Sequence, residues 1–365
     1  MNLRYPLIGM ALLLLAGCAT TETAKPKKDP FDGMDFETIL AKAKEGNIRA
    51  QVKVAIMYDT GDGVEKSPVR AVSWTRKAAL KGDPEAETLL GISYARGLGG
   101  LGKSPLEARR WFTKAANKGN SKAMEFLSSM MMAGEGGEKN QEEAAKWLIK
   151  SAESGNAGGQ HKLGHLYEDG KGVEKNLAKA FEWFLKAAEQ GDAVAQRHVA
   201  DYYDEGKGVE KDPAKKRHWV KKSAAAGDAI SQKVFGIMQI TGEEVEKNVE
   251  QGVALLQQAA IKGDIDARVR LGIVHLNDKH GQKNLQLAYF WFTVAGEKHQ
   301  LAKQGLATVN AEIKPDEMLR ALDMVSDFKN NPPKPSDGTT PAETPIDALF
   351  KKHGGKPSEP SATDK

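Results

Sequence analysis

The chain has little of several features that commonly define a protein's class. It contains one cysteine in 365 residues, Cys18, so it cannot form an internal disulfide. Basic and acidic residues nearly balance, 53 against 49, and the net charge is +4. Because nucleic-acid-binding proteins usually carry a basic stripe, this balance argues against a nucleic-acid partner. The apolar run from Pro6 to Leu15 is shorter than the about 20 residues that a membrane-spanning helix needs.

The N-terminus nevertheless has the pattern of a secretory signal peptide, with Arg4 preceding the apolar run. The run ends in Leu15-Ala16-Gly17-Cys18, which resembles the lipobox of bacterial lipoproteins. The resemblance implies a signal peptide over residues 1–17 and a lipid anchor on Cys18. Ala19 in the next position implies an outer-membrane location facing the periplasm. Residues 18–35 are then expected to form a flexible tether. The alternative is an ordinary signal peptide followed by an unrelated cysteine.

Tryptophan recurs along the chain with a nearly constant period. The spacings are 37, 36, 36 and 36 residues and then 72, with Leu255 in the skipped position. The six tryptophans are Trp74, Trp111, Trp147, Trp183, Trp219 and Trp291. A period of this size is typical of stacked helical repeats, in which each unit contacts only its neighbours. The sequence therefore indicates a scaffold rather than a globular catalytic domain.

Each copy of the repeat reads as two helices joined by a turn. A Gly-Asn or Gly-Asp pair, such as Gly155-Asn156, ends one helix with glycine and caps the next helix with the polar residue. The first helix then carries a large residue followed by a small one, such as Leu163-Gly164, and a tyrosine in the next turn of the helix. A Gly-x-Gly-Val turn follows in three copies, at residues 61–64, 170–173 and 206–209. The second helix begins after a residue that favours the N-cap position. These N-cap residues are Ser67, Ser104, Asn140, Asn176, Asp212, Asn248 and Asn284. Three copies replace the tyrosine, by Met131, Gln239 and His275.

These motifs closely resemble the Sel1-like repeat, a relative of the tetratricopeptide repeat with the pattern A-x-x-x-L-G-x-x-Y-x-x-G-x-G-V. The resemblance implies an all-α fold: a right-handed α-solenoid of about seven helix–turn–helix repeats over residues 36–311, with the first helices lining a concave surface. This chain lacks the cysteines that bridge the helix pairs in many such proteins. Packing must then stabilise the fold alone, and replacing an interior tryptophan by alanine should cost about 3–5 kcal/mol.

Both ends of the repeat array carry residues suited to capping it. Phe36, Ile39 and Leu40 form an apolar helix face before the first repeat. A capping helix is expected over residues 312–330, with an apolar stripe of Met318, Leu322, Val325 and Phe328. Residues 331–365 are rich in proline, serine and lysine and are expected to be disordered. An apolar cluster interrupts this tail, and it is either a short docking helix or accidental: Ile346, Ala348, Leu349 and Phe350.

Two motifs resemble a nucleotide-binding site and a metal site, but we expect neither site to be present. Residues 97–104 match the phosphate-binding pattern G-x-x-x-x-G-K-S, but that motif requires a preceding strand, and here a helix is expected. His161 and His165 have a spacing that metal sites use, yet the sequence places no third ligand beside them. No catalytic triad or carboxylate pair recurs. We therefore expect no catalytic, cofactor, metal or nucleotide site, and a protein that is not an enzyme.

The function expected from the sequence is that of a lipid-anchored periplasmic adaptor that binds protein partners in the groove of the solenoid. Lipoproteins with similar repeats act in envelope assembly, secretion or signalling. The candidate partner-binding residues are polar positions of two first helices: Lys162, His165, Arg197, His198, Asp201 and Tyr202. Two alternatives remain open from the sequence. One is a module that binds peptidoglycan or another glycan, and the other is a β-lactamase-like hydrolase.

Overall fold

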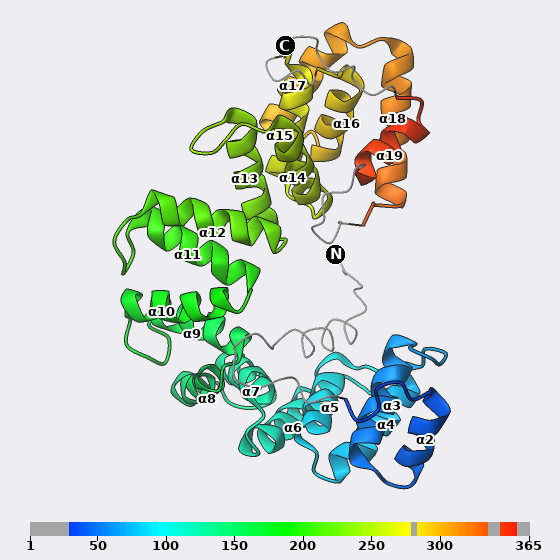
Figure 1. Ribbon diagram of the computed structural model, residues 1–365, viewed down its shortest axis with the longest axis vertical. Coiled ribbons are helices and arrows are strands. Elements are labelled where there is room, and N and C mark those ends of the chain that lie inside the picture. Colours follow the sequence, from blue (N-terminus) through cyan, green and yellow to red (C-terminus); the bar gives the residue numbers. More distant parts are fainter. Residues whose placement is uncertain (1–28, 279–282, 335–343, 356–365) are drawn as a thin grey trace. The chain divides into compact units, whose positions relative to one another are not determined.

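The computed structural model describes residues 29–278, 283–334 and 344–355. It contains eighteen helices and no strand within these ranges (Figure 1). The described residues divide into two compact units, the first comprising residues 29–192 and 207–209 and the second residues 193–206 together with the described residues from 210 onward. Within the described ranges, no helix is long and apolar enough to cross a membrane. The predicted signal peptide and Cys18 lie outside the described residues.

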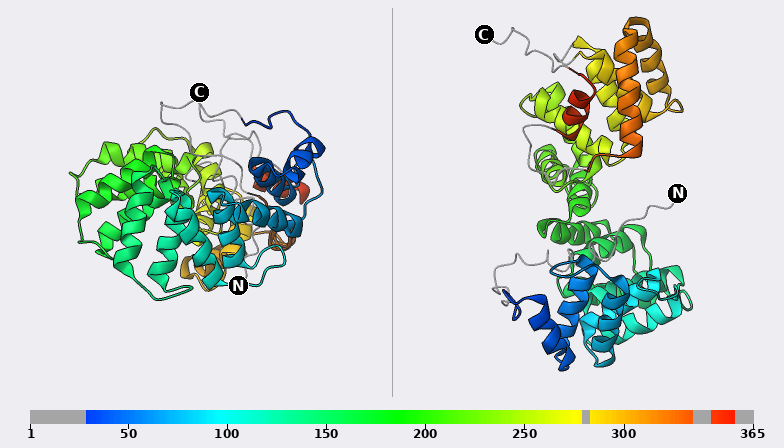
Figure 2. Two further views of the ribbon diagram at one scale, coloured as in Figure 1. Left: turned by 90° about the horizontal axis from the view of Figure 1, so that it is seen from below. Right: turned by 90° about the vertical axis from the view of Figure 1, so that its right-hand side faces the viewer.

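Helices of nearly uniform length make up both units, and Figure 2 shows them from two further directions. The first unit contains α2 (Phe36–Lys44), α3 (Ile48–Thr60), α4 (Pro68–Leu80), α5 (Pro84–Arg96), α6 (Pro105–Asn117), α7 (Ser121–Ala133), α8 (Gln141–Glu153), α9 (Ala157–Asp169) and α10 (Leu177–Glu189). The second unit contains α11 (Ala193–Glu205), α12 (Pro213–Ala225), α13 (Ala229–Thr241), α14 (Val249–Ile261), α15 (Ile265–Leu276), α16 (Leu285–Ala295), α17 (Gln300–Glu312), α18 (Pro315–Asn330) and α19 (Pro345–Lys352). The odd-numbered helices α3 to α15 are the first helices of the repeats, and the even-numbered helices α4 to α16 are the second.

The predicted caps fix where these helices begin and end. In the first repeat, the side chain of Asn47 accepts a hydrogen bond from the backbone of Ala50 at 3.0 Å. Helix α3 ends at Gly61, which has φ of +83°, a conformation that glycine adopts without steric cost. Ser67 caps α4 ahead of Pro68, whose missing N–H would have had no partner in the helix. All seven predicted N-caps of the second helices are confirmed.

One backbone hydrogen bond closes the turn of every repeat. The N–H of the second helix's N-cap residue donates to the carbonyl of the residue in the tyrosine position, as from Ser67 to Tyr58 at 2.7 Å. The same bond forms from Asn248 to Gln239 and from Asn284 to His275, at 2.8 and 2.7 Å. Since the backbone makes this bond, the tyrosine itself can be replaced. The copies that lack tyrosine therefore keep the repeat geometry.

Glycine in the first helix makes room for an aromatic ring of the second. An added Cβ at Gly164 would lie 2.6 Å from Cε1 of Phe184, closer than van der Waals contact permits. Gly91 meets Phe112 and Gly272 meets Phe292 in the same way, at 2.7 and 2.6 Å. All three phenylalanines are fully buried. The large–small pairs of the sequence are therefore the sites where the two helices of a repeat approach most closely.

Polar side chains tie the open ends of the helix pairs together. Lys81, directly after α4, donates from Nζ to the carbonyl of Gly46 just before α3, at 2.8 Å. Lys118 and Lys262 do the same to Gly82 and Gly227, at 2.9 and 2.6 Å. Burial lowers the pKa of Lys262 below its ordinary value. These lysine bonds join the ends of three of the seven helix pairs, α3 and α4, α5 and α6, and α13 and α14.

The N-terminal end of the array begins earlier than predicted. Phe36, Ile39 and Leu40 are buried on α2, which confirms the predicted apolar face. Phe31 is also buried in the same cluster, and Asp29 pairs with Lys53 at 2.8 Å. The prediction of a flexible tether up to residue 35 is therefore wrong for residues 29–35. An aromatic side chain in this segment reaches the first core cluster and orders it.

Helix α18 covers the other end of the array with a face that differs partly from the predicted stripe. Val325 and Phe328 are buried as expected, but the other buried residues are Ala321 and Met324. Leu322 is 40% exposed. The sequence pattern permits two overlapping stripes on this helix, and contact with α16 selects the one that contains Met324.

The prediction of a disordered tail is wrong for residues 344–355. Residues 345–352 form α19, and Ile346 and Phe350 are buried in the largest core cluster of the second unit. Of the two interpretations of this apolar cluster, the docking helix is correct. The rest of the predicted tail is described only at residues 331–334.

Candidate functional site

The first helices carry a periodic set of ion pairs, which we call the first-helix network. The fifth residue after the N-cap of one repeat faces the N-cap of the next. In the first unit, His161 Nδ1 lies 3.5 Å from the Asp192 carboxylate. In the second unit, Arg197 pairs with Asp228 and Lys233 with Asp264, both at 3.2 Å. The two pairs of the second unit join neighbouring repeats through carboxylates that already cap helices, since Asp228 accepts from the backbone of Ser231 and Asp264 from that of Ala267.

The charge at this fifth position follows the chemistry of the opposing cap. Three aspartates, Asp192, Asp228 and Asp264, face a histidine, an arginine and a lysine. The aspartate cap Asp83 is the exception, because the corresponding residue of the preceding repeat is Val52. Where the cap is the neutral Asn156, the corresponding residue is Glu125. A carboxylate beside an aspartate cap would be repelled, so the two positions are complementary.

Glu125 is the centre of a buried ionic cluster between α7 and α9 of the first unit. Lys122 and Lys162 each place Nζ 2.9 Å from its carboxylate, and Lys162 also donates to Ser129 Oγ at 2.9 Å. Gly158 makes room for this carboxylate, since an added Cβ would lie 2.7 Å from Glu125 Oε2. Burial is the largest single influence and raises the pKa of Glu125. The two ammoniums together outweigh it, so the net pKa lies below its ordinary value.

Of the six candidate partner-binding residues, two lie on α9 of the first unit and four on α11 of the second. Lys162 belongs to the Glu125 cluster. His165 lies 3.2 Å from Glu168, with its ring against Phe184 at a centroid distance of 4.9 Å. Arg197 contacts Asp201 at 3.7 Å in addition to Asp228.

The structure corrects the prediction at Tyr202 and leaves His198 half-buried. Tyr202 is 1% exposed, so it is a core residue and offers no side chain to a partner. Its position follows from helical spacing, because it lies three residues after the buried Val199 and one before the buried Tyr203. Lys162, His165 and Asp201 keep 40–50% of their side-chain surface exposed and stay candidates.

Sequence reasoning missed the acidic partners and two cations of the first-helix network and the Glu125 cluster. The missed residues are Lys122, Glu125, Asp192, Asp228, Lys233 and Asp264. Their signal is present in the chain, since aligning the repeats on their N-caps places basic residues and aspartate caps in register. The pattern of residues on a single helix does not predict these ion pairs, because most of them join residues of two different repeats.

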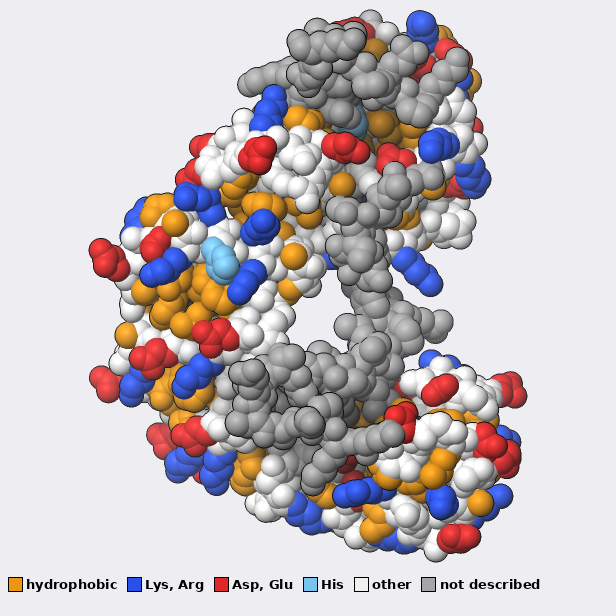
Figure 3. All heavy atoms as spheres, in the orientation of Figure 1, with side chains coloured by type: hydrophobic (Ala, Val, Ile, Leu, Met, Phe, Trp, Pro, Cys, Tyr) orange, Lys and Arg blue, Asp and Glu red, His pale blue; other side chains and the backbone are white. Residues whose placement is uncertain are grey.

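The resulting surface is polar, charged and largely paired with itself. On the face shown in Figure 3, basic and acidic side chains are interspersed over the described residues, with patches of hydrophobic side chains between them. A partner that binds here would exchange hydrogen bonds and ion pairs with the network rather than fill an apolar pocket. This arrangement favours recognition of a polar protein surface.

The glycine-rich match at residues 97–104 is part of a repeat turn. Helix α5 precedes it, as expected, and Gly97 ends that helix with φ of +71°. Ser104 caps α6 by accepting from the backbone of Glu107 at 3.3 Å. Two of the four residues that define the motif, Gly97 and Ser104, are therefore explained by helix capping.

Comparison with known proteins identifies the repeat. The Sel1 repeat matches residues 48–83, 84–120, 121–156, 157–192, 193–228, 236–264 and 265–299. The chain is similar to a protective antigen of uropathogenic Escherichia coli with an SLR fold, at 27% identity and a TM-score of 0.60, covering 88% of this chain and 68% of that one. A Sel1 repeat protein of Oxalobacter formigenes has 31% identity and a TM-score of 0.54, covering 61% and 96%.

A shorter similarity links the chain to a eukaryotic protein. The ERAD-associated E3 ubiquitin-protein ligase component HRD3A of Arabidopsis thaliana is 33% identical over 85 residues, which are 23% of this chain and 12% of that protein. The chain therefore matches a small part of this relative's length. The helix pairs, the turns and the seven matched segments agree, and the fold is an all-α solenoid. The chain belongs to the Sel1 repeat family.

Proposed function

We propose that this protein is an adaptor that binds protein partners through the exposed part of its first-helix surface. The observation that carries the proposal is the first-helix network, in which charged groups recur at one position of successive repeats. Repeat arrays of this kind commonly present extended surfaces to partners. The name of the Arabidopsis relative, a ligase component, is that of a protein within a larger assembly and is consistent with an adaptor role.

Membership in the Sel1 repeat family supports a scaffold rather than an enzyme. The candidates with the most exposed side chains are Lys162 and His165 in the first unit and Asp201 in the second, and each unit would contact partners through its own polar groups. Charged partners would be distinguished mainly by electrostatic complementarity, which affects association rate and specificity more than affinity.

We further propose that the protein is anchored by a lipid on Cys18 to the outer membrane and faces the periplasm. The support is the Leu15-Ala16-Gly17-Cys18 motif after a short apolar run. Replacing Cys18 by alanine should release the protein from the membrane fraction into the soluble periplasmic fraction. Continued sedimentation of the Cys18→Ala protein with membranes would contradict the anchor.

The adaptor proposal is tested by photo-crosslinking in cells from single positions of the full chain. A photoreactive amino acid at Lys162 or Asp201 should give one discrete adduct, identified by mass spectrometry. The same amino acid at Lys146, an exposed position on the second helix α8, is the control and should give no such adduct. Identical adduct patterns from α8 and the first helices would contradict the proposed binding surface.

A further inference from the structure

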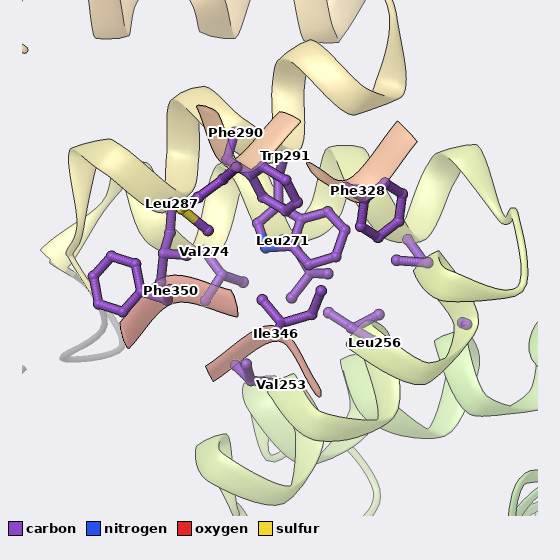
Figure 4. Close-up of a cluster of buried hydrophobic side chains, with 14 of the residues drawn as sticks. Val253, Leu256, Leu271, Val274, Leu287, Phe290, Trp291, Phe328, Ile346 and Phe350 are labelled. Atoms are coloured by element: carbon purple, nitrogen blue, oxygen red, sulfur yellow. The ribbon is translucent and has the colours of Figure 1, made fainter. Parts of the chain in front are cut away.

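The C-terminal helix α19 rests on the second unit through two side chains. Ile346 is fully buried and Phe350 is 6% exposed. They are four residues apart and thus lie on one face of the helix. Figure 4 shows both among side chains of α14, α15 and α16, including Leu256, Val274 and Leu287 of the same core cluster.

Polar contacts fix both ends of α19. At its start, Thr344 and Asp347 form a reciprocal capping box, with bonds of 2.9 and 3.1 Å. At its C-terminal end, Nζ of Lys352, the last residue of the helix, and Nε2 of the next residue, His353, lie 2.6 and 2.8 Å from Asp327 Oδ2 on α18. Asp327 therefore holds the basic end of the helix, and the apolar anchors hold its middle.

Helix α19 is so short that it depends on its contacts with the second unit to remain helical. It has eight residues, and isolated helices shorter than about 12 residues are marginal in water. Its two buried anchors come from one short segment, whereas α16 and α18 share an extended interface beneath it. Undocking of α19 would uncover an apolar surface and leave the helix pairs in place.

We propose that the surface of α14, α15, α16 and α18 beneath α19 is a groove for an amphipathic helix of a partner protein, and that α19 occupies it as an internal competitor. The partner helix would carry an aliphatic residue and an aromatic residue at i and i+4, the usual spacing of helix-in-groove anchors. A basic residue at its C-terminal end would pair with Asp327. This inference deepens the proposed adaptor function by adding a second, regulated surface, and it rests on that function.

A peptide of residues 344–355 is the probe, because it has the required pattern. Full-length protein with Ile346→Asp and Phe350→Asp has an undocked α19 and should bind the labelled peptide in fluorescence anisotropy. Wild-type protein should bind it at least about tenfold more weakly, since occupation of nine grooves in ten lowers apparent affinity by that factor. Ala348 is exposed on α19, so Ala348→Asp is the matched control and should behave as wild type.

Two further results decide the specificity of the groove. A peptide in which both anchors are aspartate should not bind the open variant. Adding Asp327→Asn to that variant should weaken binding of the original peptide several-fold. Equal binding to wild-type and open proteins, or no binding to an open variant that retains its helical circular dichroism, would overturn the proposal.

Hydrogen exchange of the wild-type protein tests the same idea without substitutions. Amides of α19 should exchange faster than those of α16 and α18, because α19 opens locally. Equal protection in the three helices would make α19 an integral core element and overturn the competitor role. A dimer that forms with rising concentration and is lost in the open variant would assign the groove to a second copy, which also overturns it.

None of these measurements uses the partner of the first-helix surface. Failure of crosslinking from Lys162 or Asp201 would therefore contradict the proposed function and leave the peptide result standing. Failure of the peptide assay would contradict the proposed groove beneath α19 but would not affect the proposal that partners bind the first-helix surface.

Discussion

The ammonium of Lys77 lies 3.9 Å from the ring centroid of Trp74, three residues earlier on α4. The same pair recurs on the second helices of the next four repeats, at distances from 3.9 to 4.8 Å. These pairs are Trp111–Lys114, Trp147–Lys150, Trp183–Lys186 and Trp219–Lys222. In these five repeats, the ammonium group of a lysine thus lies over the tryptophan ring.

Trp291 is the exception, and it leads to the first prediction. It is fully buried between Phe290 and Phe328, whereas Trp183 is half-buried beneath Lys186. Replacing Trp291 by alanine should cost about 3–5 kcal/mol, and replacing Trp183 about 2 kcal/mol because it gives up less buried surface. Urea unfolding followed by circular dichroism measures both.

The control for this comparison is Lys186→Met, which removes the charge over Trp183. It should cost no more than about 1 kcal/mol, the range of an exposed cation–π contact. Equal losses for Trp183→Ala and Trp291→Ala would show that burial does not set the difference.

The second prediction concerns the close approach of α9 and α10. Gly164→Ala places a methyl group against the Phe184 ring, so it should destabilise the protein by about 1–3 kcal/mol through overpacking. Thermal unfolding detects the loss. Phe184→Leu removes the edge of the ring and should restore part of the stability in the double variant. A Gly164→Ala protein as stable as wild type would contradict the contact.

The third prediction is a pH dependence centred on Glu125. Its pKa in the folded protein is lowered from 4.5, so the folded state favours its charged form relative to the unfolded state. The resulting stabilisation is present above pH 4.5 and is lost as the pH falls through the lowered pKa. Wild-type melting temperature should therefore fall more steeply below pH 4.5 than that of Glu125→Gln.

The exposed Glu182 on α10 provides the control, and Glu182→Gln should follow the wild-type curve. Parallel curves for wild type and Glu125→Gln would mean that the Lys122 and Lys162 ammoniums do not stabilise the carboxylate.

The fourth prediction tests the pairing between repeats in the second unit. Arg197→Met and Asp228→Asn each remove one charge, and asparagine preserves the cap that accepts from Ser231 at 2.8 Å. A double-mutant cycle should give a coupling energy of about 0.5–1 kcal/mol that shrinks at high salt. Zero coupling at low salt would contradict an energetic role for the pair.

The sequence predicts the local elements of this fold well because their causes are local. A cap, a left-handed glycine and a helical spacing each depend on a few neighbouring residues, and the seven N-caps follow directly. Burial of Tyr202, half-exposure of Trp183 and docking of α19 depend on which helix packs beside which. That information lies in contacts between segments distant in the chain, and no single helix carries it.

The first-helix network could be predicted from the sequence only in part. Its pairs join residues about 31 positions apart, as from Arg197 to Asp228. The constant repeat length places these residues in register, so the pairing was in principle readable from the chain. The exposure of each side chain cannot be predicted from the sequence in the same way, because it depends on how neighbouring helices pack.

The backbone bond from Ser104 to Tyr94, 2.8 Å long, has a practical consequence for engineering. This turn already holds one residue more than its counterparts, and both helices keep their caps. Gly100 and Gly102 face open space, with no atom within 4 Å of an added Cβ. An epitope tag or a fluorophore site inserted between them would be displayed outside the array while the same bond holds both flanks together.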